Sequence, residues 1–278
     1  IIPYKLRDEQ KIAVQMTERY QKTHQNGEFL WNAKPRFGKT LSVYDFIKQI
    51  GAVNVLIVTN RPAIANSWFS DYVKFLGSES GYLFVSEVDA LKWKKGVLTR
   101  EEYRTKVSTA ADNQFIGCIE FVSLQDMKGS LYFGGEYDKL VEISDAKDEK
   151  GNDRGMKWDV LVIDEAHEGV DTYKTDVAFE HVRRKFTLHL SGTPFKALAN
   201  NKFEDEAIFN WTYADEQEAK KNYVGENNPY LELPQIIMMT YQLPSSVINI
   251  VTDYGKDEFD LSEFFKKKKT SDNEYRFV

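Results

Sequence analysis

The chain has little of the chemistry that builds disulfides and protein-held metal clusters. It contains one cysteine, Cys118, and four histidines. A single cysteine permits neither an internal disulfide nor a cysteine-based zinc cluster. The histidines, at positions 24, 167, 181 and 189, form no HExxH or similar pattern. The sequence therefore excludes a disulfide-stapled fold and argues against a cysteine- or histidine-based metal centre.

Long apolar runs and an excess of positive charge are also missing. No stretch of about 18 apolar residues occurs, and no basic leader precedes a cleavable apolar segment. We therefore expect neither membrane insertion nor secretion, and a cytoplasmic location is the default expectation. The net charge of −6 argues against a surface that coats nucleic acid broadly, but it leaves room for a local groove. With 278 residues, of which 42% are hydrophobic, the chain can bury one large core.

Apolar runs alternate with helical stretches along the chain, which predicts an α/β fold with a mostly parallel sheet and helices on both faces. The candidate strands are 28–33, 54–59, 82–86, 115–123, 158–164 and 186–191. The candidate helices are 8–22, 40–50, 62–76, 99–110 and 174–184, with a further solvated helix from Tyr213. Two polar stretches, 87–114 and 144–157, interrupt this pattern. Ligands of such folds bind outside the carboxyl ends of the strands.

Between the first strand and its helix lies the segment Ala-Lys-Pro-Arg-Phe-Gly-Lys-Thr, residues 33–40. It fits the phosphate-loop pattern G-x-x-x-x-G-K-[ST], except that Ala33 stands in the first glycine position. Lys39 would reach the β- and γ-phosphates of a nucleotide, and the Thr40 hydroxyl would bind Mg²⁺. A chance Gly-Lys-Thr in a surface turn is the alternative, which the flanking strand and helix disfavour. The residues expected to contact the nucleotide here are Pro35, Arg36, Phe37, Gly38, Lys39, Thr40 and Leu41.

A second run of apolar residues, 158–163, ends directly on Asp164 and Glu165. A buried parallel strand delivers side chains at its carboxyl end in this way. Asp164 is then a candidate partner of Mg²⁺, and Glu165 is a candidate base that orients the attacking water. Taken alone, the same pattern also fits a strand that ends in a solvated turn.

With these motifs in place, the chain resembles the superfamily 2 helicases and translocases, and Asp164 to His167 reads as a DEAH box. The resemblance implies that residues 4–10 recognise adenine, through Gln10 and Arg7. Residues 55–62 and 121–125 resemble segments that face nucleic acid, which implies backbone contacts from Arg61, Ser123 and Gln125. Residues 190–194, Leu-Ser-Gly-Thr-Pro, resemble motif III, in which Ser191 and Thr193 would couple hydrolysis to strand movement through His167.

A narrower resemblance is to the helicase subunits of type III restriction enzymes. It rests on Pro-Arg-Phe-Gly-Lys-Thr, on Leu-His-Leu-Ser-Gly-Thr-Pro-Phe-Lys, and on residues 211–217, Trp-Thr-Tyr-Ala-Asp-Glu-Gln. This resemblance implies a RecA-like motor domain that couples ATP hydrolysis, with Mg²⁺, to movement on DNA, with RNA not excluded. A methyltransferase or specificity subunit is a further candidate partner. The alternatives are a nucleotide-gated binding or remodelling module without strand separation, and a structural pseudo-ATPase.

Two features depart from the family pattern. Pro35, Arg36 and Phe37 replace the small residues usual in the loop, which stiffens it and is expected to place bulk near the phosphates. Residues 1–245 read as the first RecA-like domain and 246–278 as a truncated linker toward a second one. That missing domain would supply an arginine finger. We therefore expect the chain alone to bind ATP weakly and hydrolyse it poorly.

Overall fold

The computed structural model describes residues 3–59, 62–111, 114–128, 147, 149–152, 155–164, 179–192, 203–233, 267–269 and 275–277. The chain forms two compact units, residues 1–233 and residues 234–278. The predicted domain boundary after residue 245 falls outside the described residues. In the second unit, β9 (Lys267–Lys269) pairs antiparallel with β10 (Tyr275–Phe277).

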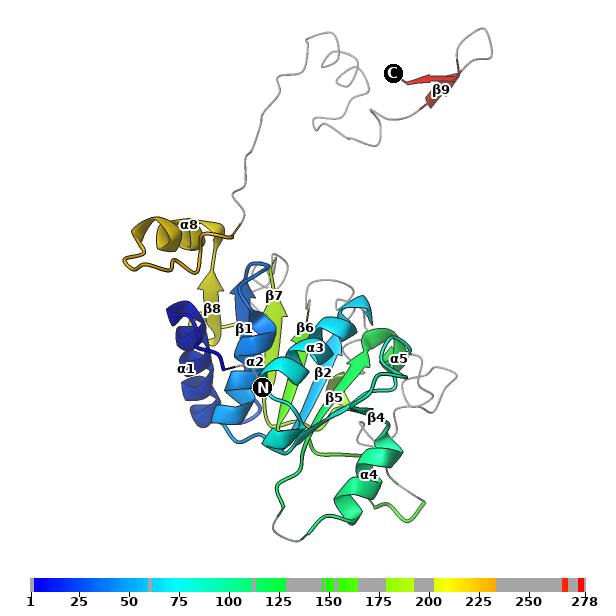
Figure 1. The fold of residues 1–278 in the computed structure, drawn as a ribbon. Helices are drawn as coiled ribbons and strands as arrows, with labels where there is room; N and C mark the ends of the chain where they lie inside the picture. The colour runs from blue at the N-terminus through cyan, green and yellow to red at the C-terminus, as the bar shows by residue number, and fades with distance from the viewer. Residues whose placement is uncertain are drawn as a thin grey trace. The chain divides into compact units, whose positions relative to one another are not determined.

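The first unit is built on an eight-stranded sheet (Figure 1) in the order β4-β3-β5-β2-β6-β7-β1-β8. All of its strand pairs are parallel. This arrangement confirms the predicted α/β fold class. The strands are β1 (Glu28–Ala33), β2 (Asn54–Thr59), β3 (Tyr82–Val85), β4 (Val97–Leu98), β5 (Gly117–Ser123), β6 (Val160–Asp164), β7 (Thr187–Ser191) and β8 (Ile208–Trp211).

Helices connect these strands and cover the sheet; Figure 1 shows α2 and α3 across the face turned to the viewer. No helix among the described residues is both long and apolar enough to cross a bilayer. The α-helices are α1 (Asp8–Thr23), α2 (Lys39–Gln49), α3 (Ala65–Phe75), α4 (Arg100–Ser108), α5 (Leu124–Lys128) and α8 (Tyr213–Asn222). Short 3₁₀ turns form η1 (Pro62–Ile64), η2 (Ser78–Ser80) and η5 (Asp205–Ala207).

Alternate residues of the central strands enter two different cores. In β2, Val55 and Ile57 join the cluster that contains α1, α2 and α3. Leu56 and Val58 join the opposite cluster, which contains residues of α5. Because both faces of the strand are buried, its sequence is a continuous apolar run, as parallel sheets require.

Several elements differ from those predicted from the sequence. The stretch 87–114 adds β4 and α4 to the fold, so it extends the sheet instead of merely interrupting it. The strand predicted from residue 115 begins at Gly117, whose N–H donates to the Gly81 carbonyl at 2.9 Å. The edge strand β8 was not predicted, whereas the helix from Tyr213 is confirmed as α8. The predicted helix 174–184 lies mostly outside the described residues.

Candidate nucleotide site

Polar side chains gather where the central parallel strands end. The sheet register pairs Thr59 of β2 with Ser123 of β5 on one side and with Asp164 of β6 on the other. On the far side of the sheet centre, Ser191 of β7 pairs with Asn32 of β1. In an open α/β sheet this edge is where ligands bind. The register therefore brings the ends of four predicted motifs to one edge.

The phosphate-loop segment follows β1 and turns directly into α2. The Phe37 amide donates to the Lys34 carbonyl at 3.2 Å, which closes a tight turn over Pro35 and Arg36. Arg36 has φ +69° and Gly38 has φ +85°, so the loop reverses twice through left-handed backbone before Lys39 starts the helix. Such conformations cost a non-glycine residue free energy and concentrate at functional sites.

Lys39 lies folded back across this loop. Its Nζ donates to the carbonyl oxygen of Ala33 at 2.7 Å. An ammonium group held by a loop carbonyl can exchange that partner for a phosphate oxygen, which carries more negative charge. Thr40 and Leu41, next along the first turn of α2, are both half-buried.

The Phe37 side chain adds no bulk to the exposed side of the loop, which corrects the expectation for this one of the three residues. Its side chain is only 1% exposed and packs in the core, with ring centroids 6.5 Å from Trp31 and 5.7 Å from Phe209. Pro35 and Arg36 are instead exposed. The aromatic ring therefore anchors the loop from beneath, because burial of an aromatic side chain is strongly favourable.

The predicted adenine-recognition segment contacts the phosphate-loop segment directly. Gln10 Nε2 and Arg7 Nη2 both donate to the Phe37 carbonyl, at 2.7 and 2.8 Å. Gln10 Oε1 in turn accepts from the backbone N–H of Arg7 at 2.8 Å, which fixes the orientation of the amide. A Cβ added at Gly38 would lie 2.5 Å from Gln10 Nε2 and would push this side chain aside, and the φ of +85° also disfavours any residue other than glycine. The amide group still has a second N–H and further lone pairs for a base.

Tyr230 joins this cluster, and sequence reasoning missed it. Its hydroxyl donates to Glu9 Oε2 at 2.7 Å, and the Arg7 guanidinium lies 5.6 Å from its ring centroid. Burial, reinforced by the neighbouring Glu9 carboxylate, raises the pKa of the Tyr230 hydroxyl. No local pattern marks this residue, because 221 positions separate it from its partner.

Trp68 of α3 holds Asp164, and this contact was also missed. The indole Nε1 donates to Asp164 Oδ2 at 2.8 Å, and the Asp164 residue is 8% exposed. Tyr44 of α2 fixes the same turn of α3 by donating its hydroxyl to the Trp68 carbonyl at 2.7 Å. The one available signal was that Trp68 falls on the apolar stripe of α3, together with Ala65, Phe69 and Tyr72.

The remaining predicted site residues differ in burial and in whether the structure describes them. Gly192, which follows Ser191, lies against the phosphate-loop segment: a Cβ added there would be 3.4 Å from Pro35 Cδ. Ser191 and Ser123 are buried, whereas Gln125 is exposed on α5. Four predicted site residues lie outside the described residues: Arg61, Glu165, His167 and Thr193.

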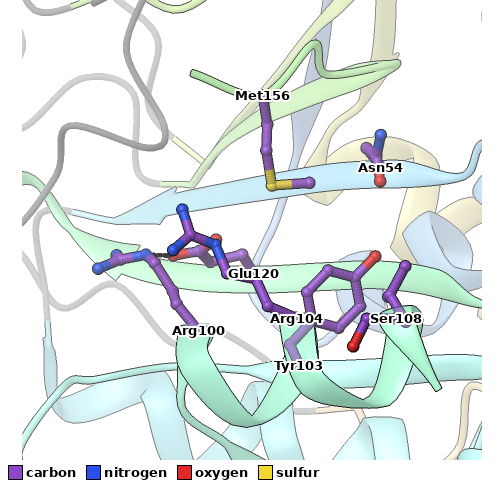
Figure 2. A pocket seen from close by; sticks show the side chains of 8 residues that line it. Asn54, Arg100, Tyr103, Arg104, Ser108, Glu120 and Met156 are labelled. Carbon is purple, nitrogen blue, oxygen red and sulfur yellow. Dashed lines mark hydrogen bonds and ion pairs between the residues drawn. The ribbon is translucent and has the colours of Figure 1, made fainter. Parts of the chain in front are cut away.

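A pocket of about 440 Å³ lies elsewhere, between α4 and the sheet (Figure 2). Asn54, which begins β2, lines it, so it reaches toward the ends of the strands opposite the nucleotide edge. Arg100 crosses from α4 to Glu120 in the middle of β5, and its Nη1 donates to Glu87 at 3.0 Å. Arg104 lines the same pocket from one turn further along α4. This pocket is separate from the predicted nucleotide site.

Comparison with known proteins relates residues 3–196 to one family. The family of type III restriction enzyme res subunits matches residues 3–196. A putative type II restriction enzyme and methyltransferase (C-terminus) of Mycoplasma pneumoniae is 28% identical, and the match covers 99% of this chain and 42% of that protein. The chain thus spans less than half the length of this curated relative.

One solved structure shares the fold at low sequence identity, and a second gives a weaker match. A nuclease-deletion mutant of the type ISP restriction-modification enzyme LlaGI, in complex with a DNA substrate mimic, superposes with a TM-score of 0.54. It is 15% identical, and the match covers 80% of this chain and 21% of that one. The Sulfolobus solfataricus SWI2/SNF2 ATPase core in complex with dsDNA gives a TM-score of 0.47 at 16% identity, over 72% of this chain and 34% of that one. The family match covers most of the chain, and the chain belongs to the family of type III restriction enzyme res subunits.

Proposed function

We propose that this chain is the nucleotide-binding half of an ATP-dependent motor that moves on DNA within a restriction enzyme. The observation that supports this most is the contact between two predicted motifs whose contacting residues lie 27 and 30 positions apart. Arg7 and Gln10 of the adenine segment both donate to the carbonyl of Phe37 in the phosphate loop. Family membership adds independent support.

In this proposal the nucleotide lies along the amino end of α2. Lys39 exchanges the Ala33 carbonyl for the β- and γ-phosphates, and loop N–H groups at the start of the helix hold the phosphate oxygens. Gln10 uses its second N–H and its carbonyl oxygen to recognise adenine. Recognition of the base and recognition of the phosphates are thereby linked through one backbone carbonyl.

The oxygen donors at this edge fit a magnesium ion. A threonine hydroxyl and an aspartate carboxylate are hard ligands of the kind Mg²⁺ prefers, so Thr40 and Asp164 would hold it, the latter oriented by Trp68. Bound there, Mg²⁺ would neutralise phosphate charge. Glu165 would orient the attacking water. His167, with Ser191 and Thr193, would relay the nucleotide state to the strand-binding edge.

The nucleic-acid part of the proposal concerns the neighbouring strand ends. Arg61, Ser123 and Gln125 would contact the strand backbone without reading bases. DNA is the proposed polymer because the matched relative is a putative restriction enzyme and methyltransferase. We also infer that residues 1–245 form the first RecA-like domain and that 246–278 lead toward a second one, which completes the ATP site.

Binding of a fluorescent ATP analogue with Mg²⁺ tests the nucleotide site. Lys39→Ala should weaken binding by at least about tenfold, because an ion-assisted hydrogen bond to phosphate is lost. Lys48→Ala, an exposed position on the same helix, is the matched control and should leave the affinity unchanged. Thermal unfolding of both variants checks that the fold is intact. Equal affinities of Lys39→Ala and the original chain would refute the proposed phosphate contact.

Turnover tests the need for a second domain. An arginine finger contributes about 10³ to 10⁵ in rate, so the isolated chain should hydrolyse ATP slowly, with or without DNA. Steady-state phosphate release is the measurement. Robust DNA-stimulated hydrolysis by the 278-residue chain would show that it needs no partner domain.

A further inference from the structure

A tightly built turn connects β3 to β4 and carries three lysines. The amides of Leu91 and Lys94 donate to the carbonyls of Val88 and Leu91, both at 2.9 Å, and Val97 donates to Lys94 at 3.1 Å. Val88 and Leu91 are buried in the same core cluster as α3. Residues Lys92 to Lys95, between Leu91 and Val97, form the lysine turn. Its backbone is therefore held in place by the fold.

Trp93 stands exposed at the centre of the lysine turn. Its exposed fraction is 89%, whereas Trp31, Trp68 and Trp158 are essentially inaccessible. The Lys92 ammonium lies 5.7 Å from the Trp93 ring centroid, and Lys92, Lys94 and Lys95 are all exposed. A buried leucine and valine anchor the turn, so the indole is not needed to hold it. A flat aromatic surface beside the Lys92 ammonium is thus presented to solvent, in a turn with two further exposed lysines.

The local charge differs from that of the chain as a whole. The chain carries a net charge of −6, but within residues 88–96 three lysines face one carboxylate, Asp89. The adjacent carboxylate of Glu87 is engaged by Arg100 at 3.0 Å. Lys94 and Lys95 have no ion-pair partner in the part of the chain that the structure describes. The turn is therefore a locally basic surface that fits an anionic partner.

The connection that carries the lysine turn begins beside the proposed strand-binding edge. Residue Ser86, at the start of the connection, donates its hydroxyl to the Phe121 carbonyl of β5 at 2.8 Å. β3 is the neighbour of β5, which ends at Ser123, a proposed backbone contact. The connection that carries the lysine turn therefore leaves the sheet next to the proposed nucleic-acid contacts.

We propose that the lysine turn binds a nucleic-acid strand with unpaired bases. The ammonium groups of Lys92, Lys94 and Lys95 contact phosphates, and the Trp93 indole stacks on one base. Aromatic stacking between basic residues is how proteins hold single strands without reading their sequence. An acidic protein surface would match the lysines but would make no use of a flat indole. The inference extends the strand contacts of the proposed function, but its chemistry can be tested without ATP.

Three DNA probes of equal length test it on the 278-residue chain by fluorescence anisotropy: a mixed-sequence single strand, an abasic single strand and a duplex. Trp93→Ala should weaken binding of the base-bearing strand about tenfold and leave binding of the abasic strand unchanged. Lys92→Gln/Lys94→Gln/Lys95→Gln should reduce the slope of log affinity against log salt by about 2, since each phosphate contact on a single strand contributes about 0.7. The matched control is Lys22→Gln/Lys48→Gln/Lys106→Gln, three exposed lysines on α1, α2 and α4.

Four outcomes would overturn the inference: no effect of Trp93→Ala, equal binding of the abasic and base-bearing strands, equal weakening by the control triple, or full competition by polyglutamate. Titration of fluorescent ATP into the same samples separates this inference from the proposed function. If the chain binds ATP but the lysine-turn variants do not change DNA binding, only the proposed strand contact is refuted. If the original chain does not bind ATP, the result would instead count against the proposed nucleotide site.

Discussion

Asp159 ties the starts of two neighbouring strands together with one side chain. Its Oδ2 accepts from the backbone N–H groups of Val53 and Asn54 at 2.7 and 2.9 Å, and its Oδ1 accepts from Lys185 Nζ at 2.7 Å. Burial acts to raise the pKa of this carboxyl, but the lysine and the two backbone donors outweigh it and lower the pKa. The ionised carboxylate therefore stabilises the fold.

Asp159→Asn should lower the free energy of unfolding by about 2 kcal/mol at neutral pH, because charge-assisted hydrogen bonds are weakened. A lowered folded-state pKa means that the stabilisation is complete above the unfolded-state value of about 3.9. It is lost as the pH falls through the folded-state pKa. Urea unfolding between pH 7 and pH 3 measures this difference, with the exposed Asp205→Asn as control. A gap between Asp159→Asn and the original chain that is independent of pH would contradict the assignment.

Arg100 and Glu120 form an ion pair that is almost fully buried, on the wall of the pocket in Figure 2. Arg100→Ala should lower the free energy of unfolding by about 3 to 5 kcal/mol, because it leaves the Glu120 carboxylate without its principal partner. Arg100→Met/Glu120→Leu should recover most of that loss, since the buried charge is removed as well. Lys106→Ala on the exposed side of α4 should change stability by less than about 0.5 kcal/mol. A double variant no more stable than Arg100→Ala would mean that charge burial is not the cause.

At the scale of elements, α8 and the segment that follows it fasten the end of the first unit onto α1. Lys220 Nζ donates to the carbonyls of Leu231 and Leu233, at 3.1 and 3.0 Å, and the Asn228 side chain bridges to Lys220 and Tyr230. Tyr230 then reaches Glu9 at the beginning of α1. The residues flanking Gln10 are thus supported from the far end of the unit.

Tyr230→Phe should destabilise the unit by about 1 to 3 kcal/mol, because the buried Glu9 carboxylate loses a donor. It should also weaken binding of fluorescent ATP, since Arg7 and Gln10 lose part of their positioning. Tyr223→Phe, a more exposed ring beside Tyr230, is the control for both readouts. Unchanged ATP affinity in a destabilised Tyr230→Phe chain would limit the residue to a structural role.

Elements with strong local signals could be predicted from the sequence, and elements defined by distant contacts could not. β1 and β2 have the bounds predicted, because apolar runs end sharply at polar loops. The two-residue β4 and the half-exposed β8 carry too little apolar pattern to stand out. The same division holds in the site. The phosphate loop can be recognised from the spacing of its glycine, lysine and threonine residues. Trp68 and Tyr230, in contrast, contact Asp164 and Glu9 only through the tertiary fold.

At the scale of the whole molecule, Cys118 reports on the integrity of the sheet. It is fully buried in β5, between β2 and β3, and burial raises the pKa of its thiol. Both effects suppress its reaction with alkylating reagents. Labelling should therefore proceed only through global unfolding, and its rate should rise with denaturant along with the unfolded fraction. Rapid labelling that is insensitive to denaturant would reveal a local opening of the sheet. The region around α4 would then be examined first.

The strand order also has a consequence for synthesis. β1 leaves the ribosome before the other strands of this sheet, yet its neighbours are β7 and β8, and Glu28 pairs with Thr187. The strand before the phosphate loop therefore has no hydrogen-bonded neighbour in the sheet while more than half of the chain is translated. Contacts of such long sequence separation form late and slowly. A nascent chain arrested before β7 should present this apolar strand to chaperones and lack a finished nucleotide pocket, so that competence for ATP arrives only late in the translation of the unit.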